Sequence, residues 1–270
     1  MSVFRLDLKR NIGEIISWAV IISACIAIMM FLHRMFGNIF NPDSFSARIS
    51  ALPALVQGVL GLGGAPDLSQ PFQFAAYIFQ FVMLLSGIYA CTLGARALAG
   101  EESKGTIEFL YGLPVSRGSI LRQKFFCGIF RYWIYCTVVF AVTCLMIWLL
   151  NRDMSISGII IALIRAYICL FFSGLVYMSV GILLSALFRS NAESISVALA
   201  LVLITHIIGM LGSVMPHLKF LCYLSPVHAM LPLNALNNGF SIIGLAVGAA
   251  TIIVTALLAS LRYRKKDFLV

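Results

Sequence analysis

Charged residues are scarce in this chain. Asp, Glu, Lys and Arg together make up 11% of the 270 residues, and only 10 residues are acidic, whereas a soluble domain carries about 25% charged residues. Hydrophobic residues reach 61%, against about 45–50% in soluble domains. This composition excludes an ordinary soluble domain and predicts an integral membrane protein.

Enzyme and metal signatures are also missing from the sequence. We find no Gly-x-Ser-x-Gly, no His-Glu-x-x-His and no pair of mid-membrane aspartates. The seven cysteines include no Cys-x-x-Cys, and the four histidines have no metal-binding spacing. Gly100 to Thr106 resembles a phosphate-binding loop, but Thr106 stands where that motif needs its Lys. We therefore predict no catalytic residue, no metal and no cofactor in this chain.

The formal net charge is +9. A nucleic-acid-binding protein gathers its basic residues on one folded polar face, but here they lie between apolar runs. This placement is typical of the cytoplasmic flanks of membrane helices, so we predict a lipid bilayer and no nucleic acid as partner.

Six apolar runs are long enough to cross about 30 Å of hydrocarbon as helices, which takes roughly 20 residues. They are Ile15–Leu32, Phe72–Ala95, Tyr132–Leu150, Ala166–Phe188, Ser194–Met215 and Phe240–Leu261. The predicted fold is an all-α integral membrane protein whose residues 1–270 form a single transmembrane domain.

Lys and Arg set the orientation of these six spans. One side would hold Arg5, Lys9, Arg10, Arg96, Lys104, Arg117, Arg122, Lys124, Arg131, Arg189, Arg262, Arg264, Lys265 and Lys266. The other side would hold only Arg34, Arg48, Arg152, Arg165 and Lys219. The positive-inside rule then places both termini, the tail 1–14 and the connection 99–124 in the cytoplasm.

Two connections fall on the outer side, at residues 37–71 and 215–239. Within the first, Phe45–Leu60 has two interpretations, a helix lying on the membrane surface or an ordered loop. The second is apolar but interrupted by Pro216, Pro226 and Pro232. We interpret it as a broken or re-entrant segment, which requires protein or water around its backbone.

A few residues inside or beside the spans leave alternatives open. His206 is either a neutral histidine bonded to a neighbouring helix or a functional ionisable group. Arg131 and Arg165 lie near span ends, where they can reach lipid head groups. Small residues recur every four positions at Ser86, Ala90 and Gly94, and again at Gly244 and Gly248; they suit either packing inside the bundle or a dimer contact.

The one long polar passage runs from Glu101 to Lys124. Thr106–Tyr111 can form a short helix that presents Ile107, Leu110 and Tyr111 on one side and Glu108 on the other. Gly112 and Pro114 end this helix, and Ser116 is placed to cap the next one. Mixed charge around a small apolar surface is typical of docking to a protein.

This passage resembles the cytoplasmic loop of the permease subunits of type-2 ABC exporters. The resemblance rests on the acidic residue, the Gly-Thr, the helical turn, the Leu-Pro-x-Ser-Arg and the closing Lys. These are Glu101 or Glu102, Gly105-Thr106, Glu108 and Leu110, Leu113-Pro114-Val115-Ser116-Arg117, and Lys124. Six spans with inside termini fit the same family.

The resemblance implies a bacterial cell-membrane pump of two permeases, as two copies or a copy with a paralogue, and two cytoplasmic ABC ATPase subunits that hold ATP and Mg. We expect Ile107, Leu110 and Tyr111 to fill a groove of the ATPase and charged residues to set the register. The predicted ATPase-coupling residues are Glu101, Glu102, Lys104, Gly105, Thr106, Ile107, Glu108, Leu110, Tyr111, Leu113, Pro114, Val115, Ser116 and Arg117.

Two other classes remain as alternatives. A secondary transporter or channel would need inverted repeats or membrane-centred charges, and a membrane enzyme would need clustered catalytic residues. Because the spans carry so little charge, we expect an apolar or amphipathic cargo such as a drug, a peptide antibiotic or a lipid.

Overall fold

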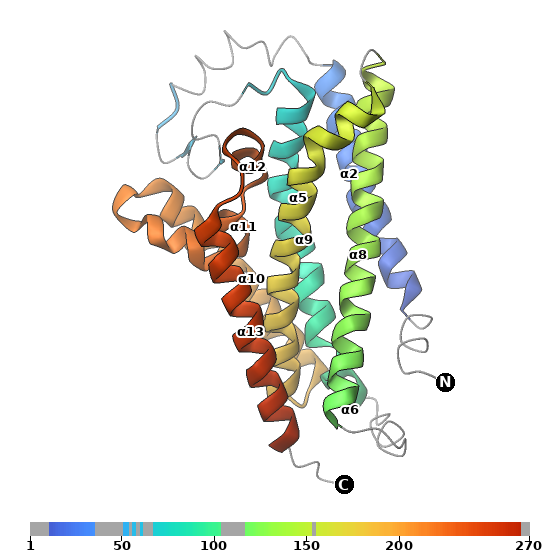
Figure 1. Ribbon diagram of the computed structural model, residues 1–270, viewed down its shortest axis with the longest axis vertical. Coiled ribbons are helices and arrows are strands. Elements are labelled where there is room, and N and C mark those ends of the chain that lie inside the picture. The colour runs from blue at the N-terminus through green and yellow to red at the C-terminus, as the bar shows by residue number, and fades with distance from the viewer. Residues whose placement is uncertain are drawn as a thin grey trace.

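The computed structural model describes residues 11–35, 51–53, 56–57, 60–61, 67–103, 117–152 and 155–265. Within these ranges the regular elements are helices and no strand occurs. Six helices are long and apolar enough to cross a membrane, which confirms the predicted all-α class (Figure 1). They are α2 (Ile12–Met35), α5 (Pro71–Ala95), α8 (Arg117–Leu150), α9 (Ile156–Leu187), α10 (Asn191–Val214) and α13 (Ile242–Lys265).

Helices α8 and α9 begin earlier than the hydropathy of the sequence predicts. The predicted spans started at Tyr132 and Ala166, but α8 has 34 residues and α9 has 32. At 1.5 Å per residue each is about 50 Å long, so each continues as helix beyond the hydrocarbon thickness. Helix α9 starts where Ser155 accepts a hydrogen bond from the Gly158 amide. Arg165 therefore lies within α9 and not in an outer loop.

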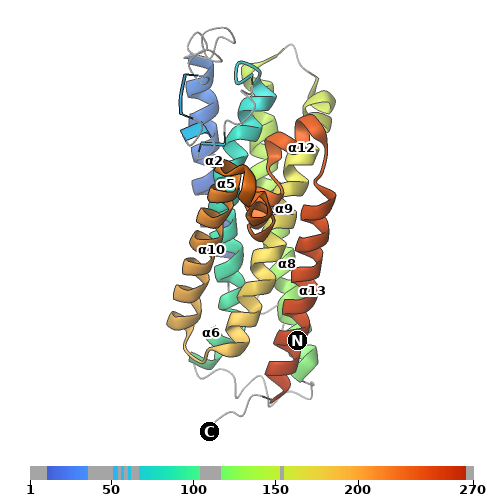
Figure 2. The same cartoon turned by 90° about the vertical axis from the view of Figure 1, so that its left-hand side faces the viewer.

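Helices α5 and α9 form the centre of the bundle. Helix α5 is buried over most of its length, and α9 is the next most buried. Helices α2 and α8 lie on one side of this pair, and α10 and α13 lie on the other (Figures 1 and 2). The other four spanning helices leave apolar residues such as Ile21, Ile204 and Leu257 exposed, as expected for surfaces that face lipid.

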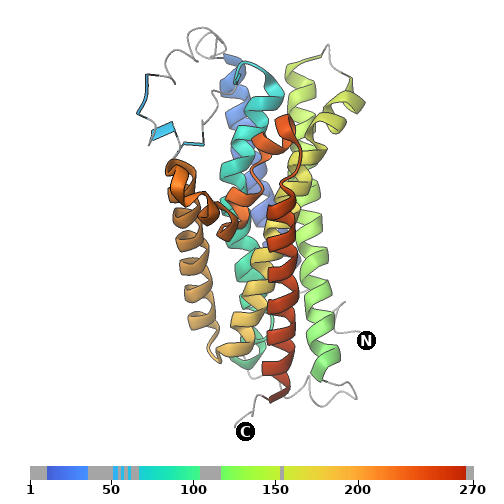
Figure 3. The same cartoon turned by 60° about the vertical axis from the view of Figure 1, so that its left-hand side comes forward.

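The bundle has two ends, which we name by the short helices found there. The α6 end holds α6 (Ala99–Ser103), and the α12 end holds α12 (Pro232–Asn238). Helix α2 starts toward the α6 end and α13 finishes there (Figures 1 and 3). The described helix ends nearest the two termini therefore share one side of the bundle.

The segment between α10 and α13 is broken into three short helices, as predicted for residues 215–239. They are η2 (Pro216–Leu224), α11 (Pro226–Ala229) and α12. Each begins with a proline, whose missing N–H group is tolerated at a helix start. Helix α11 lies deeper in the bundle than α12, so the chain enters from the α12 end and returns to it (Figure 3).

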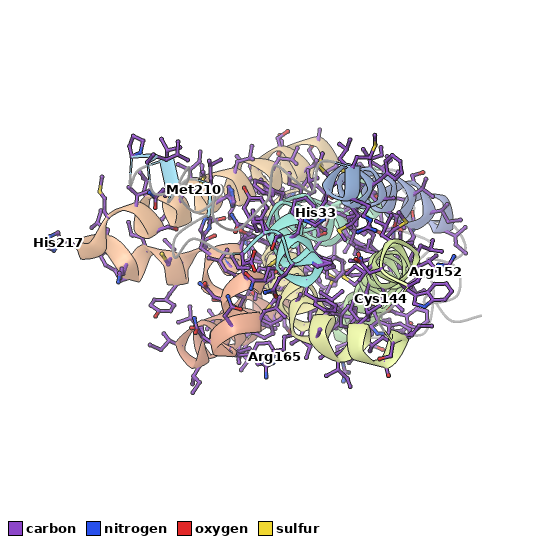
Figure 4. The ribbon with its side chains drawn as sticks, turned by 90° about the horizontal axis from the view of Figure 1, so that it is seen from above. His33, Cys144, Arg152, Arg165, Met210 and His217 are labelled. Carbon is purple, nitrogen blue, oxygen red and sulfur yellow. The ribbon has the colours of Figure 1, made fainter. Side chains whose placement is uncertain are left out.

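Side chains satisfy part of the backbone of this broken segment. The Ser225 hydroxyl caps α11 at the His228 amide, and Arg165 Nη1 donates to the Leu236 carbonyl oxygen at 3.1 Å. Arg165 is exposed, and through this bond it holds the end of α12. Figure 4, which looks onto the α12 end, shows His217 at the outer tip of η2, away from the bundle.

The connection 37–71, which was predicted to lie on the outer side, is described only in short stretches. Most of Phe45–Leu60, for which two interpretations were left open, lies outside the described residues. Just before α5, the Leu68 carbonyl oxygen is 2.8 Å from His33 Nε2, and the His33 ring stacks on Phe74. These contacts join the end of α2 to the start of α5.

Candidate coupling site at the α6 end

The connection between α5 and α8 starts from a rigid base. Gly94 in α5 faces the backbone of α9, where an added Cβ atom would lie 2.3 Å from the Met178 carbonyl oxygen. Gly181 in α9 faces α5 in the same way, and its Cβ would lie 2.2 Å from the Cys91 carbonyl oxygen. Because glycine lets the two backbones touch, α5 and α9 form one unit at this end.

Two serines from other helices hold the chain as it leaves α5. The Ser185 hydroxyl of α9 accepts hydrogen bonds from the amides of Leu98 and Ala99, both at 2.8 Å. The Ser194 hydroxyl of α10 donates to the Ala95 carbonyl oxygen at 3.0 Å. Both serines are buried. They satisfy backbone groups that the end of α5 and the start of α6 leave unpaired, so the path from α5 into α6 is fixed.

A buried ion pair links the two sides of the connection. Lys124 Nζ in α8 lies 2.9 Å from Glu101 Oε1 in α6, and the two side chains are 4% and 7% exposed. Removing one partner of a buried pair leaves an uncompensated charge and costs about 3–5 kcal/mol. The pair therefore holds α6 against the first turns of α8.

Glu14 at the start of α2 extends this network of charges. Its Oε1 lies 2.8 Å from Arg96 at the end of α5, and its Oε2 lies 2.8 Å from Arg131 in α8. Arg131 is buried, so the expectation that it reaches lipid head groups is wrong. The side chain pairs inward because the carboxylate that neutralises it sits on α2.

These groups surround one small cavity of about 190 Å³, lined among others by Glu14, Arg96, Glu101, Lys124, Arg131 and Asn191. The Asn191 amide at the start of α10 also donates to the Ser103 hydroxyl of α6 at 2.9 Å. Side chains of α2, α5, α6, α8 and α10 thus meet at the place where residues 104–116 join the bundle. These contacts join several spanning helices at that place.

Loss of the Glu14 carboxylate is expected to destabilise the protein more than loss of one of its partners, Arg96. Glu14→Gln leaves the buried Arg131 without its counter-ion, at a cost of about 3 kcal/mol. Arg96 is 47% exposed, so Arg96→Gln removes a largely hydrated pair worth about 0–1 kcal/mol. Thermal unfolding of the purified variants measures the difference. Equal midpoints for the two variants would contradict the network.

The predicted coupling residues fall in three groups. Glu101 is buried and paired with Lys124, Glu102 is half-buried in α6, and Arg117 is the first residue of α8. The remaining predicted residues, Lys104 to Ser116, lie outside the described residues. The predicted helix that follows Ser116 is present, and it continues without a break into the third span.

The sequence did not predict that Glu14, Arg131, Ser185 and Ser194 are parts of this base. Glu14 offered the clearest signal, because an acidic residue at the start of an otherwise apolar helix needs a cationic partner. The buried serines offered none, because a hydroxyl inside a span can bond to its own helix instead.

His206, for which two interpretations were left open, lies against the broken segment. Its ring in α10 packs against that of His228 in α11, with ring centroids 4.8 Å apart. Its Nδ1 is buried and has no hydrogen-bond partner among the described residues, so the predicted bond to a neighbouring helix is not found at this nitrogen. The residue joins α10 to the broken segment by ring contact.

Six helices of membrane-spanning length and hydropathy define a multi-pass membrane protein. Residues 17–268 match the sequence model of the ABC-2 family transporter proteins, and the chain therefore belongs to that family. This membership confirms the resemblance to ABC permease subunits and assigns the chain to transport across a membrane. A comparison with curated proteins gives no match.

Proposed function

We propose that this chain is the membrane subunit of an ATP-driven exporter and that residues 104–116 dock to a separate ATPase. The α6 end then faces the cytoplasm, in agreement with the Lys and Arg distribution. ATP and Mg bind to the partner ATPase, and a second permease, identical or paralogous, completes the pump. Closure of the ATPase pair on ATP moves the docked connection and shifts the helices between inward and outward access.

The observation that carries this proposal is the attachment of the connection on both sides. On the α5 side, Ser185 and Ser194 fix the chain, and on the α8 side Lys124 pairs with Glu101. A docking loop that hung loosely from the bundle would bind an ATPase without transmitting its motion. Here a force on residues 104–116 acts directly on α5 and α8.

Glu101 takes a different part in this mechanism from the one first expected. It was predicted to set the register with the ATPase, but its carboxylate is buried and pairs with Lys124 inside the chain. We assign it to positioning the base of the connection. Contacts with the ATPase then fall to Glu102, Glu108, Arg117 and the apolar group Ile107, Leu110 and Tyr111.

Two substitutions separate docking from transmission. Arg117→Glu reverses a charge at the proposed interface and is expected to weaken co-purification with the ATPase at least about tenfold. Pro114→Gly makes the connection compliant, because glycine releases the fixed φ of proline. This variant is expected to keep the complex and lose ATP-driven movement, measured as a distance change between spin labels at Asn151 and Asn237, near the α12 end.

Arg152→Glu is the matched control, since Arg152 lies at the α12 end, exposed, with its guanidinium 4.7 Å from the Trp148 ring. It makes the same charge reversal and should leave complex formation unchanged. A normal complex and normal ATP-driven movement in both Arg117→Glu and Pro114→Gly would overturn the proposed function.

A further inference from the structure

The largest cavity among those described lies at the α12 end and measures about 660 Å³. Its walls come from α5, from the end of α10 and above all from the broken segment η2, α11 and α12. Pockets that bind small molecules have volumes of about 300–1,000 Å³. The irregular backbone of this segment thus surrounds a space large enough for a ligand. Within a membrane, such backbone is tolerated where it lines a water-filled cavity or is buried in protein.

Polar side chains converge on this cavity from several helices. They include Gln80, Ser213, Lys219, His228, Asn234 and Asn238. Gln80 is 5% exposed and belongs to a membrane-spanning helix, where an amide without a hydrogen-bond partner costs about 1–3 kcal/mol. A buried amide that faces a cavity with other amides and a hydroxyl group indicates a ligand or water that bonds to it.

The charge of the lining restricts the ligand. None of the described lining residues is Asp or Glu, and Lys219 contributes one positive charge. A cationic ligand would enter this space without a carboxylate to compensate its charge, at the cost of its hydration. Amides, hydroxyl groups and one Lys are matched by a neutral or anionic group that bears hydroxyl, amide or phosphate oxygen atoms.

An apolar groove adjoins the polar cavity. It has a volume of about 280 Å³ and runs between α9, α10 and α13, with Val176, Leu201 and Val247 among its walls. The two spaces share Tyr223, Ala229 and Met230. These three residues form a common border, so a molecule that passes them would place a polar head in the cavity and an apolar chain in the groove.

We infer that the cavity and groove together bind an amphipath with a neutral or anionic, hydrogen-bonding head group, and that this amphipath is the exported cargo. The assignment of this amphipath as cargo rests on the proposed export function, but its binding needs no ATPase. The composition of the chain predicted any apolar or amphipathic cargo. The lining of the cavity excludes cationic drugs from that class.

The test uses the purified permease alone in lipid nanodiscs, with a photoreactive dodecyl glycoside as probe. Dodecyl maltoside, dodecyl phosphate and dodecyltrimethylammonium carry the same chain and compete with the probe. We expect the neutral and anionic compounds to reduce cross-linking at concentrations at least about tenfold lower than the cationic one needs. Equal competition by all three compounds would overturn the inference, because it would show that the protein contacts only their dodecyl chain and does not distinguish the head groups.

Variants then locate the site. Gln80→Leu and Asn234→Leu are expected to weaken probe binding by about five- to tenfold each, the effect of losing one hydrogen bond. Val247→Phe fills the apolar groove and should weaken probe binding by a similar factor. The matched controls are Asn151→Leu, outside the cavity, and Leu257→Phe on the exposed face of the same helix α13. Unchanged binding in the three site variants, with thermal midpoints showing that they fold, would overturn the inference.

A second arm adds the ATPase and measures ATP-driven movement of the same probe across vesicle membranes. Movement that is lost in Gln80→Leu supports cargo binding at this site. Binding without ATP-driven movement, in a complex that still shows the ATP-dependent spin-label distance change, assigns the site to a resident lipid and overturns the cargo assignment. Absence of the distance change would count against the proposed function instead.

Discussion

Gly94→Ala and Gly181→Ala are each expected to lower the free energy of unfolding by about 2 kcal/mol or more. The added Cβ atom would lie 2.3 Å from the Met178 carbonyl oxygen in the first variant and 2.2 Å from the Cys91 carbonyl oxygen in the second. These are backbone atoms that cannot rotate away, so α5 and α9 must separate. Overpacking of this kind costs typically about 1–3 kcal/mol and occasionally more.

The sign of the effect makes this prediction specific. Replacing glycine by alanine inside a helix normally stabilises the helix by about 1 kcal/mol, so a net loss can come only from the close contact. Gly13→Ala is the control, since nothing lies within 4 Å of its added Cβ atom; it should keep or raise the thermal midpoint. The double variant Gly94→Ala with Gly181→Ala should fall short of the sum, because both report on the same contact. Additive losses would show that the two contacts are independent, and an unchanged or raised thermal midpoint in both single variants would show that the helices do not touch here.

The transmembrane layout could be predicted from the sequence because hydropathy responds directly to the bilayer. Each of the six predicted spans corresponds to one of the spanning helices, and the prolines placed the broken segment before α13 correctly. Hydropathy did not predict the starts of α8 and α9, although the capping position of Ser116 did predict a helix that begins there and runs toward the third span. Helix continuation past the hydrocarbon depends on capping and propensity at residues such as Arg117 and Ser155, which hydropathy does not measure.

Contacts between distant residues were beyond the sequence alone. Glu14 and Arg131 are 117 positions apart, and no local pattern pairs them. The small residue Gly94 indicated that some backbone approaches closely, but only the fold identifies α9 as the partner. It likewise assigns Gly244 to the Ala229 backbone and Gly248 to Phe172, so these glycines pack inside the bundle, one of the two interpretations left open.

The proposed coupling site could likewise be predicted from the sequence only in part. Its polar composition was visible in the sequence, since Glu101 to Lys124 is the one long polar passage. Its physical basis was not, because Ser185, Ser194 and Glu14 come from other parts of the chain. The sequence thus indicated the position of the connection. The fold supplies the attachments that would let the connection transmit force.

Reversing the charge of either member of the Glu101 and Lys124 pair is expected to have the largest effect on coupling. Lys124→Glu places two carboxylates in a buried site where the native atoms are 2.9 Å apart. We expect a loss of about 3–5 kcal/mol in stability and at least about a tenfold loss of ATP-driven movement, measured by the spin-label distance change in the complex. Glu101→Lys should behave alike, because it brings two ammonium groups together.

The exchanged pair, Glu101→Lys with Lys124→Glu, distinguishes the two roles considered for Glu101. If the carboxylate positions the base of the connection, the exchange restores opposite charges and recovers a large part of both stability and movement. If instead Glu101 contacts the ATPase, Glu101→Gln weakens complex formation without lowering the thermal midpoint of the isolated permease, and the exchange rescues nothing. Glu193→Gln, an exposed carboxylate at the same end, controls for general charge effects and should leave stability and movement unchanged. We expect rescue by the exchange, because both side chains are almost fully buried and a buried charge requires its partner close by.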